Sequence, residues 1–240
     1  MKHVFIGKKK REYYKGLLIK ADLGLHEQIA ERIQLDATPS GKILDLGAGE
    51  GALSLRLSDL GFNVTAVDKD ENNFKCTQVK FARVNFDSPE EISKFVAQHE
   101  NEFDAVLGVE VIEHVQDQWQ YVRQLIKMTK PGGLVLITTP NTSSWISRLS
   151  FLFTGRFHQF GDGDLSYGHI NPVSPWELEL ILEASGATQV SISPAGTLPR
   201  IYLSGFNKLS ILNFFILPVR LMMTGVLDGW CVMATARKIK

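Results

Sequence analysis

The segment Ile43–Gly51, which reads Ile-Leu-Asp-Leu-Gly-Ala-Gly-Glu-Gly, constrains the fold more than any other part of the chain. Its apolar residues, interrupted by Asp45, predict a buried strand of a parallel sheet. Three alternating glycines follow the strand: Gly47, Gly49 and Gly51. Because glycine has no Cβ, the backbone here can take positive φ, and a ligand can lie against the main chain at the start of a helix. The segment therefore predicts a binding loop for a nucleotide-bearing ligand.

Two acidic residues bear on which ligand this loop binds. Asp45 lies two residues before Gly47, where its carboxylate would favour a cationic group such as an amino acid ammonium and would repel the pyrophosphate of a dinucleotide. Asp68 follows the next expected strand, 63–67, at about the 20-residue spacing at which a carboxylate accepts ribose hydroxyls. That spacing fits NAD as well, and the loop with Ala52 satisfies the dinucleotide fingerprint. An adenosine ligand with an amino acid end is favoured, and NAD stays as the alternative.

Strands and helices alternate along the chain. The expected strands cover residues 43–46, 63–67, 79–84, 103–107, 134–138, 190–193 and 230–236. The expected helices cover residues 22–35, 52–60, 89–99, 118–128 and 175–186. This order predicts right-handed crossovers, a mostly parallel sheet and a ligand at the carboxyl ends of the strands. The Lys-Pro-Gly-Gly sequence at 130–133 predicts a turn, and Asn141, at the carboxyl end of the fifth strand, is expected to meet substrate.

The composition predicts a single-domain protein that is located in the cytoplasm. With 240 residues, 44% of them hydrophobic, the chain can bury one sizeable core, so we expect a single domain over residues 1–240. Lys plus Arg and Asp plus Glu both number 26, and the zero formal charge argues against a long nucleic-acid footprint. Cys76 and Cys231 have no metal or redox spacing, and the basic N-terminus lacks the apolar run of a secretory signal. These features predict a reducing, cytoplasmic location.

A second polar cluster follows the strand at 103–107. Glu110, Glu113 and His114 are spaced so that a helix or turn places them on one face, at the edge where the ligand is expected. Crowded carboxylates raise one carboxyl pKa and an imidazole titrates near neutrality, so this set can take a proton from a substrate hydroxyl. Alternatively, the three residues and His169 hold a divalent cation. A third interpretation leaves Glu113 and His114 as residues that cap and orient the segment.

The glycine loop, the Glu-Val-Ile-Glu-His segment at 110–114 and the Lys-Pro-Gly-Gly turn occur in an order that resembles the class I S-adenosylmethionine-dependent methyltransferases, from about Gly41 to the C-terminus. The chain is similar to the ubiquinone-biosynthesis O-methyltransferases within this class. The small-RNA 3′-terminal ribose methyltransferases also use a Glu-x-x-Glu-His set with a further histidine, to hold a metal. The resemblance implies a Rossmann-like, seven-stranded, mostly parallel sheet with helices on both faces and an antiparallel last strand.

The resemblance also implies S-adenosylmethionine as the cofactor. Asp45 and the glycine loop would hold its methionine half, Asp68 its ribose and Asp87 its adenine amino group, with Phe86 alongside. An alternative interpretation makes Asp87 the cap of the helix that begins at Pro89. The expected cofactor contacts are Asp45, Gly47, Ala48, Gly49, Gly51, Asp68, Lys69, Phe86, Asp87 and Gly108.

The implied reaction is methyl transfer to an oxygen of a small, apolar or lipid-linked acceptor. Most of the catalysis should come from placing that oxygen in line with the sulfonium. The expected catalytic residues, which remove the acceptor proton directly or through a cation, are Glu110, Glu113, His114 and His169. Terminal ribose methylation of RNA is one alternative. A catalytically inactive, cofactor-binding partner protein at a membrane is another.

Three segments are expected to extend the domain. Residues 1–40 predict an N-terminal helical cap, in which His26 lies on the polar surface. Residues 142–172 are rich in large apolar side chains and predict a lid over an apolar substrate. Residues 205–228 predict a second apolar insertion. Polar residues interrupt its central part, 208–227, which argues against a membrane span and favours internal packing or contact with a membrane interface.

Overall fold

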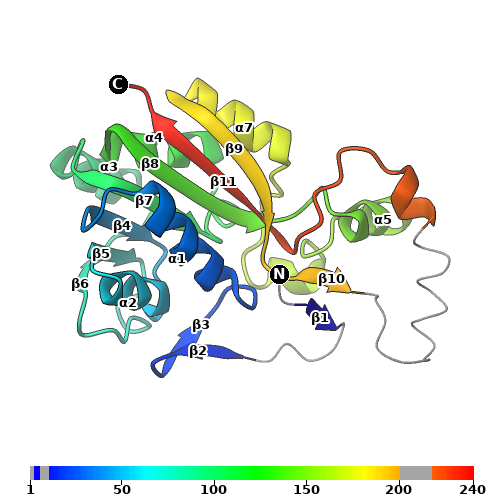
Figure 1. The fold of residues 1–240 in the computed structure, drawn as a ribbon, viewed down its shortest axis with the longest axis horizontal. Helices are drawn as coiled ribbons and strands as arrows, with labels where there is room; N and C mark the ends of the chain where they lie inside the picture. Colours follow the sequence, from blue (N-terminus) through cyan, green and yellow to red (C-terminus); the bar gives the residue numbers. More distant parts are fainter. Residues whose placement is uncertain (1–2, 6–10, 201–217) are drawn as a thin grey trace.

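A seven-stranded sheet forms the centre of the computed structural model, which describes residues 3–5, 11–200 and 218–240 (Figure 1). In spatial order its strands are β6 (Lys80–Arg83), β5 (Asn63–Asp68), β4 (Lys42–Leu46), β7 (Phe103–Val109), β8 (Thr129–Pro140), β11 (Cys231–Lys238) and β9 (Ala187–Ala195). The first five pair in parallel, whereas β11 runs antiparallel to both β8 and β9. The predicted Rossmann-like sheet with an antiparallel last strand is thus confirmed.

The strand order reverses at β4. From β4 the chain adds β5 and β6 on one side, and it then returns to place β7 and β8 on the other. Four of the five residues of β4 are buried, as expected of a strand covered on both faces. The loops that leave the carboxyl ends of β4 and β7 diverge, and the crevice between such loops is the usual ligand site of an open α/β sheet.

Helices cover both faces of the sheet, and each face has its own apolar core (Figure 1). The helices on one face are α3 (Pro89–Gln98), α4 (Gln118–Met128) and α7 (Pro175–Ala184). Those on the other face are α1 (Leu25–Asp36) and α2 (Ala52–Asp59). Each connection between neighbouring parallel strands therefore crosses one face or the other, which leaves the carboxyl edge of the sheet free for a site.

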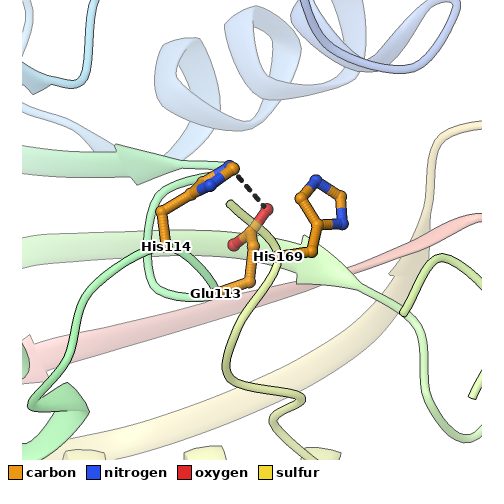
Figure 2. Close-up of side chains that lie close together, drawn as sticks. All are labelled: Glu113, His114 and His169. Carbon is orange, nitrogen blue, oxygen red and sulfur yellow. Dashed lines mark ion pairs between the residues drawn. The ribbon is translucent and has the colours of Figure 1, made fainter. Parts of the chain in front are cut away.

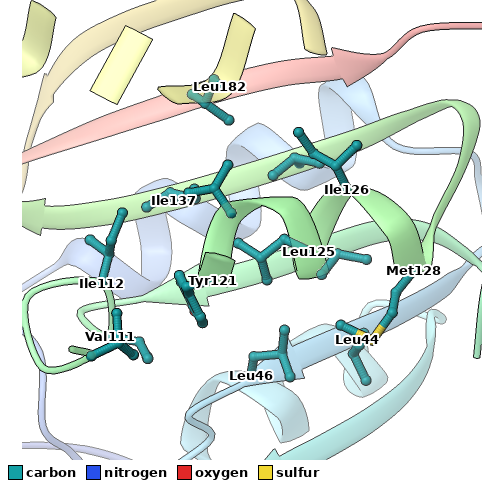
Figure 3. Close-up of a cluster of buried hydrophobic side chains, with 14 of the residues drawn as sticks. Leu44, Leu46, Val111, Ile112, Tyr121, Leu125, Ile126, Met128, Ile137 and Leu182 are labelled. Atoms are coloured by element: carbon teal, nitrogen blue, oxygen red, sulfur yellow. The ribbon is translucent and has the colours of Figure 1, made fainter. Parts of the chain in front are cut away.

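The predicted helix at 118–128 is confirmed as α4, and its local sequence explains it. The Asp117 side chain caps the helix by accepting a hydrogen bond from the Gln120 amide at 2.8 Å. Its apolar stripe, which includes Tyr121 and Leu125, is buried in one cluster with Leu44 of β4 (Figure 3). α4 thereby supports the sheet directly behind the strands that reach the site.

The N-terminal segment differs from the helical cap predicted over residues 1–40. Helix α1 is present, but β2 (Glu12–Tyr14) and β3 (Leu17–Ile19) form an antiparallel hairpin before it. Leu17 and Ile19 are buried in the core on the side of α1 and α2. This period-two burial stabilises strands rather than a helix.

Strand β8 is longer than the strand predicted at 134–138. It begins at Thr129, which pairs with Phe103, and the next pair in the ladder joins Ala105 to Leu134. The prediction of a turn before the strand is therefore wrong. The Lys-Pro-Gly-Gly sequence is accommodated as an irregularity inside β8, where Gly132 takes a φ of 76°.

The lid segment, residues 142–172, contains α5 (Trp145–Thr154) and α6 (Asp162–Leu165). Trp145 and Phe160 are buried, so part of its apolar content belongs to the core. Leu152 and Phe153 are instead largely exposed on α5. The lid segment therefore has one face packed on the domain and one face toward solvent.

The second predicted insertion, 205–228, is described only from residue 218, so most of the predicted interfacial segment 208–227 lies outside the described residues. Strand β10 (Leu198–Arg200), which precedes it, pairs in parallel with β1 (His3–Phe5). Residues 218–222 are helical. Within the ranges that the structure describes, no helix has both the length and the apolar character needed to cross a membrane.

Candidate active site

A cavity of about 540 Å³ opens at the carboxyl ends of β4 and β7, where the strand order reverses. It is bounded by the glycine loop, the ends of β5 and β6, the segment after β7, the N-terminal hairpin and the lid segment. The predicted site residues that line it are Asp45, Gly47, Ala48, Gly49, Asp68, Lys69, Phe86, Asp87, Glu110, His114 and His169. The glycine loop at 45–51 and the segment at 110–114 thus meet at one cavity. In a fully extended chain the two would be more than about 100 Å apart.

Two positions in the glycine loop require the absence of a side chain. Gly47 has a φ of 84°, and a Cβ on it would lie 2.3 Å from Val111 Cγ2. Its N–H donates to the Val67 carbonyl at 2.8 Å, which holds the loop against β5. Gly51 has a φ of 89°, and a Cβ there would lie 2.6 Å from the Cβ of Cys76. Gly51, predicted to contact the cofactor, therefore serves the close packing behind the loop and does not line the cavity.

Asp68, the last residue of β5, fixes the glycine loop from the side. Its Oδ2 accepts a hydrogen bond from the Gly49 N–H at 2.8 Å, and its Oδ1 accepts one from the Asp70 N–H at 3.1 Å. These charge-assisted bonds hold the carboxylate in one orientation. Because each carboxylate oxygen has a second lone pair, Asp68 can still accept hydrogen bonds from a ligand in the cavity.

Asp45 is buried beneath the loop, with an exposed fraction of 1%. Its Oδ2 accepts a hydrogen bond from Ser54 Oγ at 2.5 Å. Burial raises the pKa of Asp45 to about 6, the nearby charge of Asp68 adds to the rise, and the Ser54 hydrogen bond opposes it. A cationic group of a ligand bound beside Asp45 would stabilise its ionised form, as the sequence predicts for an ammonium.

Asp87 is not the cap of α3. That position is taken by Ser88, whose side chain accepts the hydrogen bond from the Glu91 N–H. The interpretation of Asp87 as a helix cap is therefore wrong, and its side chain lines the cavity together with Phe86. The backbone N–H of Asp87 donates to Asn85 Oδ1 at 3.1 Å, which fixes the turn that presents both residues.

His26 lines the cavity and is buried, contrary to the prediction that it lies on the polar surface. It shares the buried face of α1 with Ile29 and Ile33, a spacing that the sequence already showed. Burial lowers the pKa of His26 to about 4, with the positive charge of Arg56 as a smaller cause. The ring is therefore neutral at physiological pH.

The N-terminal hairpin forms part of the cavity wall, which sequence reasoning missed. The Glu50 side chain, inside the glycine loop, accepts a hydrogen bond from the Leu18 N–H at 2.9 Å and pairs with Lys75 at 2.5 Å. Lys20 also lines the cavity and donates to Asn73 Oδ1 at 2.8 Å. The available signal for a strand here was the short apolar run at 17–19, which follows Gly16.

Glu113, His114 and His169 converge beside the cavity, and each offers one ligand atom within 4.8 Å of the others (Figure 2). Glu113 and His114 lie in the turn after β7, and His169 comes from the lid segment. The rings of His114 and His169 meet edge to face, with centroids 4.9 Å apart. Of the predicted set of Glu110, Glu113, His114 and His169, the last three thus lie together in the structure.

Glu110 is held apart from this trio. Its φ is 54°, and its backbone N–H donates to the Thr138 carbonyl and side chain at 3.1 Å each. Its Oε1 accepts a hydrogen bond from Thr138 Oγ1 at 2.9 Å, and its Oε2 accepts one from Cys231 Sγ at 3.4 Å. Glu110 therefore lines the cavity as a neighbouring charge that is oriented by β8 and β11.

Burial controls the charge of Glu113 and His114. Glu113 has no exposed surface, and burial together with the charge of Glu110 raises its pKa well above the usual range. Its Oε2 accepts a hydrogen bond from Thr139 Oγ1 at 3.1 Å, whereas its buried Oε1 has no hydrogen-bond partner and lies 3.9 Å from His114 Nε2. Burial also lowers the pKa of His114, and His169 adds to this effect. At neutral pH His114 is therefore an uncharged imidazole.

The tautomer of His169 follows from its hydrogen bond. Its Nδ1 lies 2.8 Å from the backbone carbonyl of Gln159, and a carbonyl oxygen only accepts hydrogen bonds. Nδ1 therefore carries a proton, and in the neutral ring Nε2 keeps its lone pair. An imidazole in this state can accept a proton or bind a cation at Nε2.

Two other residues predicted to belong to the site, Gly108 and Asn141, do not line the cavity. The space beside Gly108 is filled by Tyr121, because a Cβ on Gly108 would lie 2.4 Å from the Tyr121 hydroxyl, and Gly108 does not line the cavity. Asn141 was expected to meet substrate, but it is buried, and its side-chain amide donates to the carbonyls of Leu227 and Gly229 at 2.6 and 3.0 Å. That prediction is wrong, because the end of β8 is covered by the chain that enters β11.

Comparison with known proteins agrees with this geometry. A family model described as a methyltransferase domain matches residues 22–192. The ubiquinone biosynthesis O-methyltransferase of Caulobacter vibrioides is 39% identical over 102 residues, which make up 41% of this chain and 40% of that protein. The protein of the same name from Caulobacter sp. is 36% identical over 125 residues, 49% of this chain and 50% of that protein. The chain thus spans about half the length of the curated relatives it matches.

The fold is shared with solved structures. A SAM-dependent methyltransferase from Archaeoglobus fulgidus superposes with a TM-score of 0.62 at 18% identity, over 89% of this chain and 94% of that one. At this identity the likeness concerns the fold alone. The family match, in contrast, covers residues 22–192 of 240, which is well over half of the chain. The chain therefore belongs to the methyltransferase-domain family.

Proposed function

We propose that the chain transfers the methyl group of S-adenosylmethionine to an oxygen atom of a small, apolar acceptor. The observation that carries this proposal is the joining, around one cavity, of the glycine loop and Asp68 with His114 and His169, which lie close to the buried Glu113. A cofactor held by the first group would direct its methyl toward the second. The relatives named as ubiquinone biosynthesis O-methyltransferases support oxygen as the acceptor atom.

The cofactor would lie along the carboxyl edge of the sheet. Asp45 and the loop around Gly47 would hold its methionine half, since a buried carboxylate is suited to bind the ammonium group. Asp68 would accept the ribose hydroxyls. Asp87 would accept from the adenine amino group while Phe86 packs beside the ring.

The acceptor oxygen would lose its proton at the histidine end of the cavity. In the transfer, a new bond forms between the oxygen and the methyl carbon, the bond from that carbon to sulfur breaks, and the sulfonium becomes a neutral thioether. The acceptor proton must go to a base. His114 is uncharged at neutral pH because burial lowers its pKa, so its imidazole is suited to take this proton.

A divalent cation is the alternative way to activate the acceptor. Two imidazoles and a carboxylate are a donor set that first-row divalent metals accept, and the buried Oε1 of Glu113, which has no hydrogen-bond partner, is a free ligand atom. The residues present therefore fit such an ion, with Glu113, His114 and His169 as its ligands. When bound, a cation lowers the pKa of a coordinated hydroxyl. Binding of Zn²⁺ or Mn²⁺ by the EDTA-treated protein, and its loss in Glu113→Gln, would test this.

We further propose peripheral contact between this enzyme and a membrane, on its cytoplasmic side. Arg148 of α5 donates hydrogen bonds of 2.8 Å to the carbonyls of both Thr224 and Gly225, which ties the lid segment to the second insertion. Exposed apolar side chains gather on these two segments: Phe151, Leu152, Phe153, Val219, Leu221 and Met222. A patch of this kind suits an interface with apolar material. Flotation with liposomes that is lost when Leu152 and Phe153 are both changed to Ser would support it.

The proposed reaction is tested by methyl transfer from radiolabelled S-adenosylmethionine. We expect label in a lipid extract or in a small apolar acceptor, and none in total RNA. Label in RNA would replace the proposal with terminal ribose methylation. Cofactor binding without transfer to any fraction would instead support the inactive partner protein.

A further inference from the structure

Gln159 lies in the lid segment between α5 and α6 and has a φ of 70°, in the left-handed region that residues with a side chain seldom adopt. Its carbonyl accepts the hydrogen bond from His169 Nδ1 at 2.8 Å. Left-handed backbone at a residue with a Cβ persists where its surroundings hold it in place. The neighbours of Gln159 therefore indicate what keeps this carbonyl on His169.

The Gln159 side chain is anchored on a distant part of the chain. Its Nε2 donates to the Trp230 carbonyl at 3.0 Å. Trp230 ends the return turn, residues 227–230, which leads into β11. This turn is fixed on both sides: the Trp230 N–H donates to the Thr197 carbonyl at 2.8 Å, and the Asn141 side chain donates to two carbonyls of the turn. Gln159 thus spans a firmly held turn and the His169 ring.

We propose that Gln159 is a positioning residue for His169. Its amide, anchored on the return turn, holds its carbonyl against His169 Nδ1. This hydrogen bond keeps the neutral ring, which lies beside Glu113 and His114, in the tautomer whose Nε2 is unprotonated. The inference rests on the proposed function, in which His169 Nε2 handles the acceptor proton or a cation. It adds a residue that acts on the reaction through His169 and not by contact with the reacting atoms.

A purely structural Gln159 would have a different signature. Loss of its side chain would then lower the stability of the lid segment but would leave the protonation pattern of the His169 ring unchanged. If Gln159 positions the ring, the same loss releases Nδ1 from its acceptor and allows the proton to move to Nε2. The position of the ring proton therefore separates the two roles.

The test is the ¹⁵N spectrum of the imidazoles in the 240-residue chain, with His169→Gln used to assign the His169 signals. We expect His169 to be protonated at Nδ1 in the wild type and to become a mixture of tautomers in Gln159→Ala. Gln189→Ala is the matched control, because Gln189 is also a left-handed glutamine, with a φ of 52°, but it is exposed in β9 and does not line the cavity. Its spectrum should match the wild type.

Two results would overturn the inference: His169 protonated at Nε2 in the wild type, or an unchanged Nδ1 signal in Gln159→Ala. The wild-type spectrum alone decides the first, so the test survives a variant that fails to fold. In activity, Gln159→Ala should lower kcat about tenfold or more with no change in S-adenosylhomocysteine affinity, since the cofactor contacts are untouched. If the tautomer shifts in Gln159→Ala but the wild-type protein transfers no methyl group, the positioning role of Gln159 stands. The proposed function is then contradicted.

Discussion

The two ends of the cavity are built over very different distances in the sequence. The cofactor end, the part around the glycine loop and Asp68, is the part proposed to hold the cofactor. There the hydrogen bond from Gly49 to Asp68 joins residues 19 positions apart, within one β–α–β unit. The acceptor end, the part around His114 and His169, is the part proposed to hold the acceptor, and there the hydrogen bond that anchors Gln159 on Trp230 joins residues 71 positions apart. His169 itself comes from the lid segment and meets Glu113 from the turn after β7. Local sequence therefore builds the first end, and the packing of distant segments builds the second.

The difference implies that variants at the two ends should fail in different ways. Changes at the cofactor end should reduce cofactor affinity, because the loop makes the binding surface itself. Changes at the acceptor end should reduce the rate of transfer and leave the affinity intact.

The largest effect is expected at the acceptor end. His114→Ala should lower kcat by about 10²- to 10⁴-fold, the range of a lost general base, with S-adenosylhomocysteine affinity unchanged by calorimetry. His99→Ala is the control, because His99 pairs with Glu102 at the end of α3 and lies away from the cavity. An unchanged rate in His114→Ala, or an equal loss in His99→Ala, would break the division.

At the cofactor end, Gly47→Ala should lower cofactor affinity by about 100-fold. A Cβ at 2.3 Å from Val111 Cγ2 forces the loop to move, and overpacking of this kind costs about 1 to 3 kcal/mol in stability. Gly61→Ala is matched to it, since Gly61 has a similar φ of 91° but no atom within 4 Å of the added Cβ. Calorimetry and urea unfolding of both variants separate the contact with Val111 from backbone strain. Equal losses in the two variants would mean that strain alone matters.

The neutral His26 predicts a pH effect on stability at the cofactor end. The folded protein holds the pKa of His26 at about 4, while its ordinary value is 6.5, so between these values the unfolded state binds more protons. Stability is therefore lost as the pH falls through this window, by up to about 3 kcal/mol. The raised pKa of Asp45 acts in the opposite direction, so the comparison with His26→Gln, which does not titrate, isolates the contribution. Urea unfolding from pH 7 to pH 4 should show the greater loss in the wild type; parallel curves would contradict it.

The smallest effect is expected where the hairpin meets the glycine loop. Glu50→Gln keeps an acceptor for the Leu18 N–H but loses the charge that pairs with Lys75, so cofactor affinity should fall only about threefold to tenfold. The rate of transfer at saturating cofactor should not change. A loss of rate with full affinity would show that the hairpin acts on the acceptor end, against the division.

Much of the fold was predictable because its signals are local. The alternation of strands and helices and the glycine turn each depend on neighbouring residues, and they predicted the mostly parallel sheet and α4 correctly. The N-terminal hairpin was missed because short strands carry little periodicity. The bulge in β8 was missed because Lys-Pro-Gly-Gly is typical of a turn, and only pairing of Thr129 with Phe103 makes it part of a strand.

The site was predictable where a motif carried it and not where packing did. Asp68 and the Glu-His segment stood out by spacing. Nothing in the sequence singles out Gln159, because its role depends on a carbonyl direction and on the remote Trp230. The prediction for Asn141 was wrong because it also depends on distant packing. Its place after β8 suggests a substrate contact, but the return turn covers it.

The most direct test of the account is a calorimetric titration of S-adenosylhomocysteine and of NADH into the purified protein, with Asp68→Ala alongside. We expect micromolar binding of S-adenosylhomocysteine, no binding of NADH, and loss of the affinity in the variant, because the Asp68 carboxylate orients the glycine loop and is proposed to accept the ribose hydroxyls. Binding of NADH in place of S-adenosylhomocysteine, or full affinity in Asp68→Ala, would contradict it.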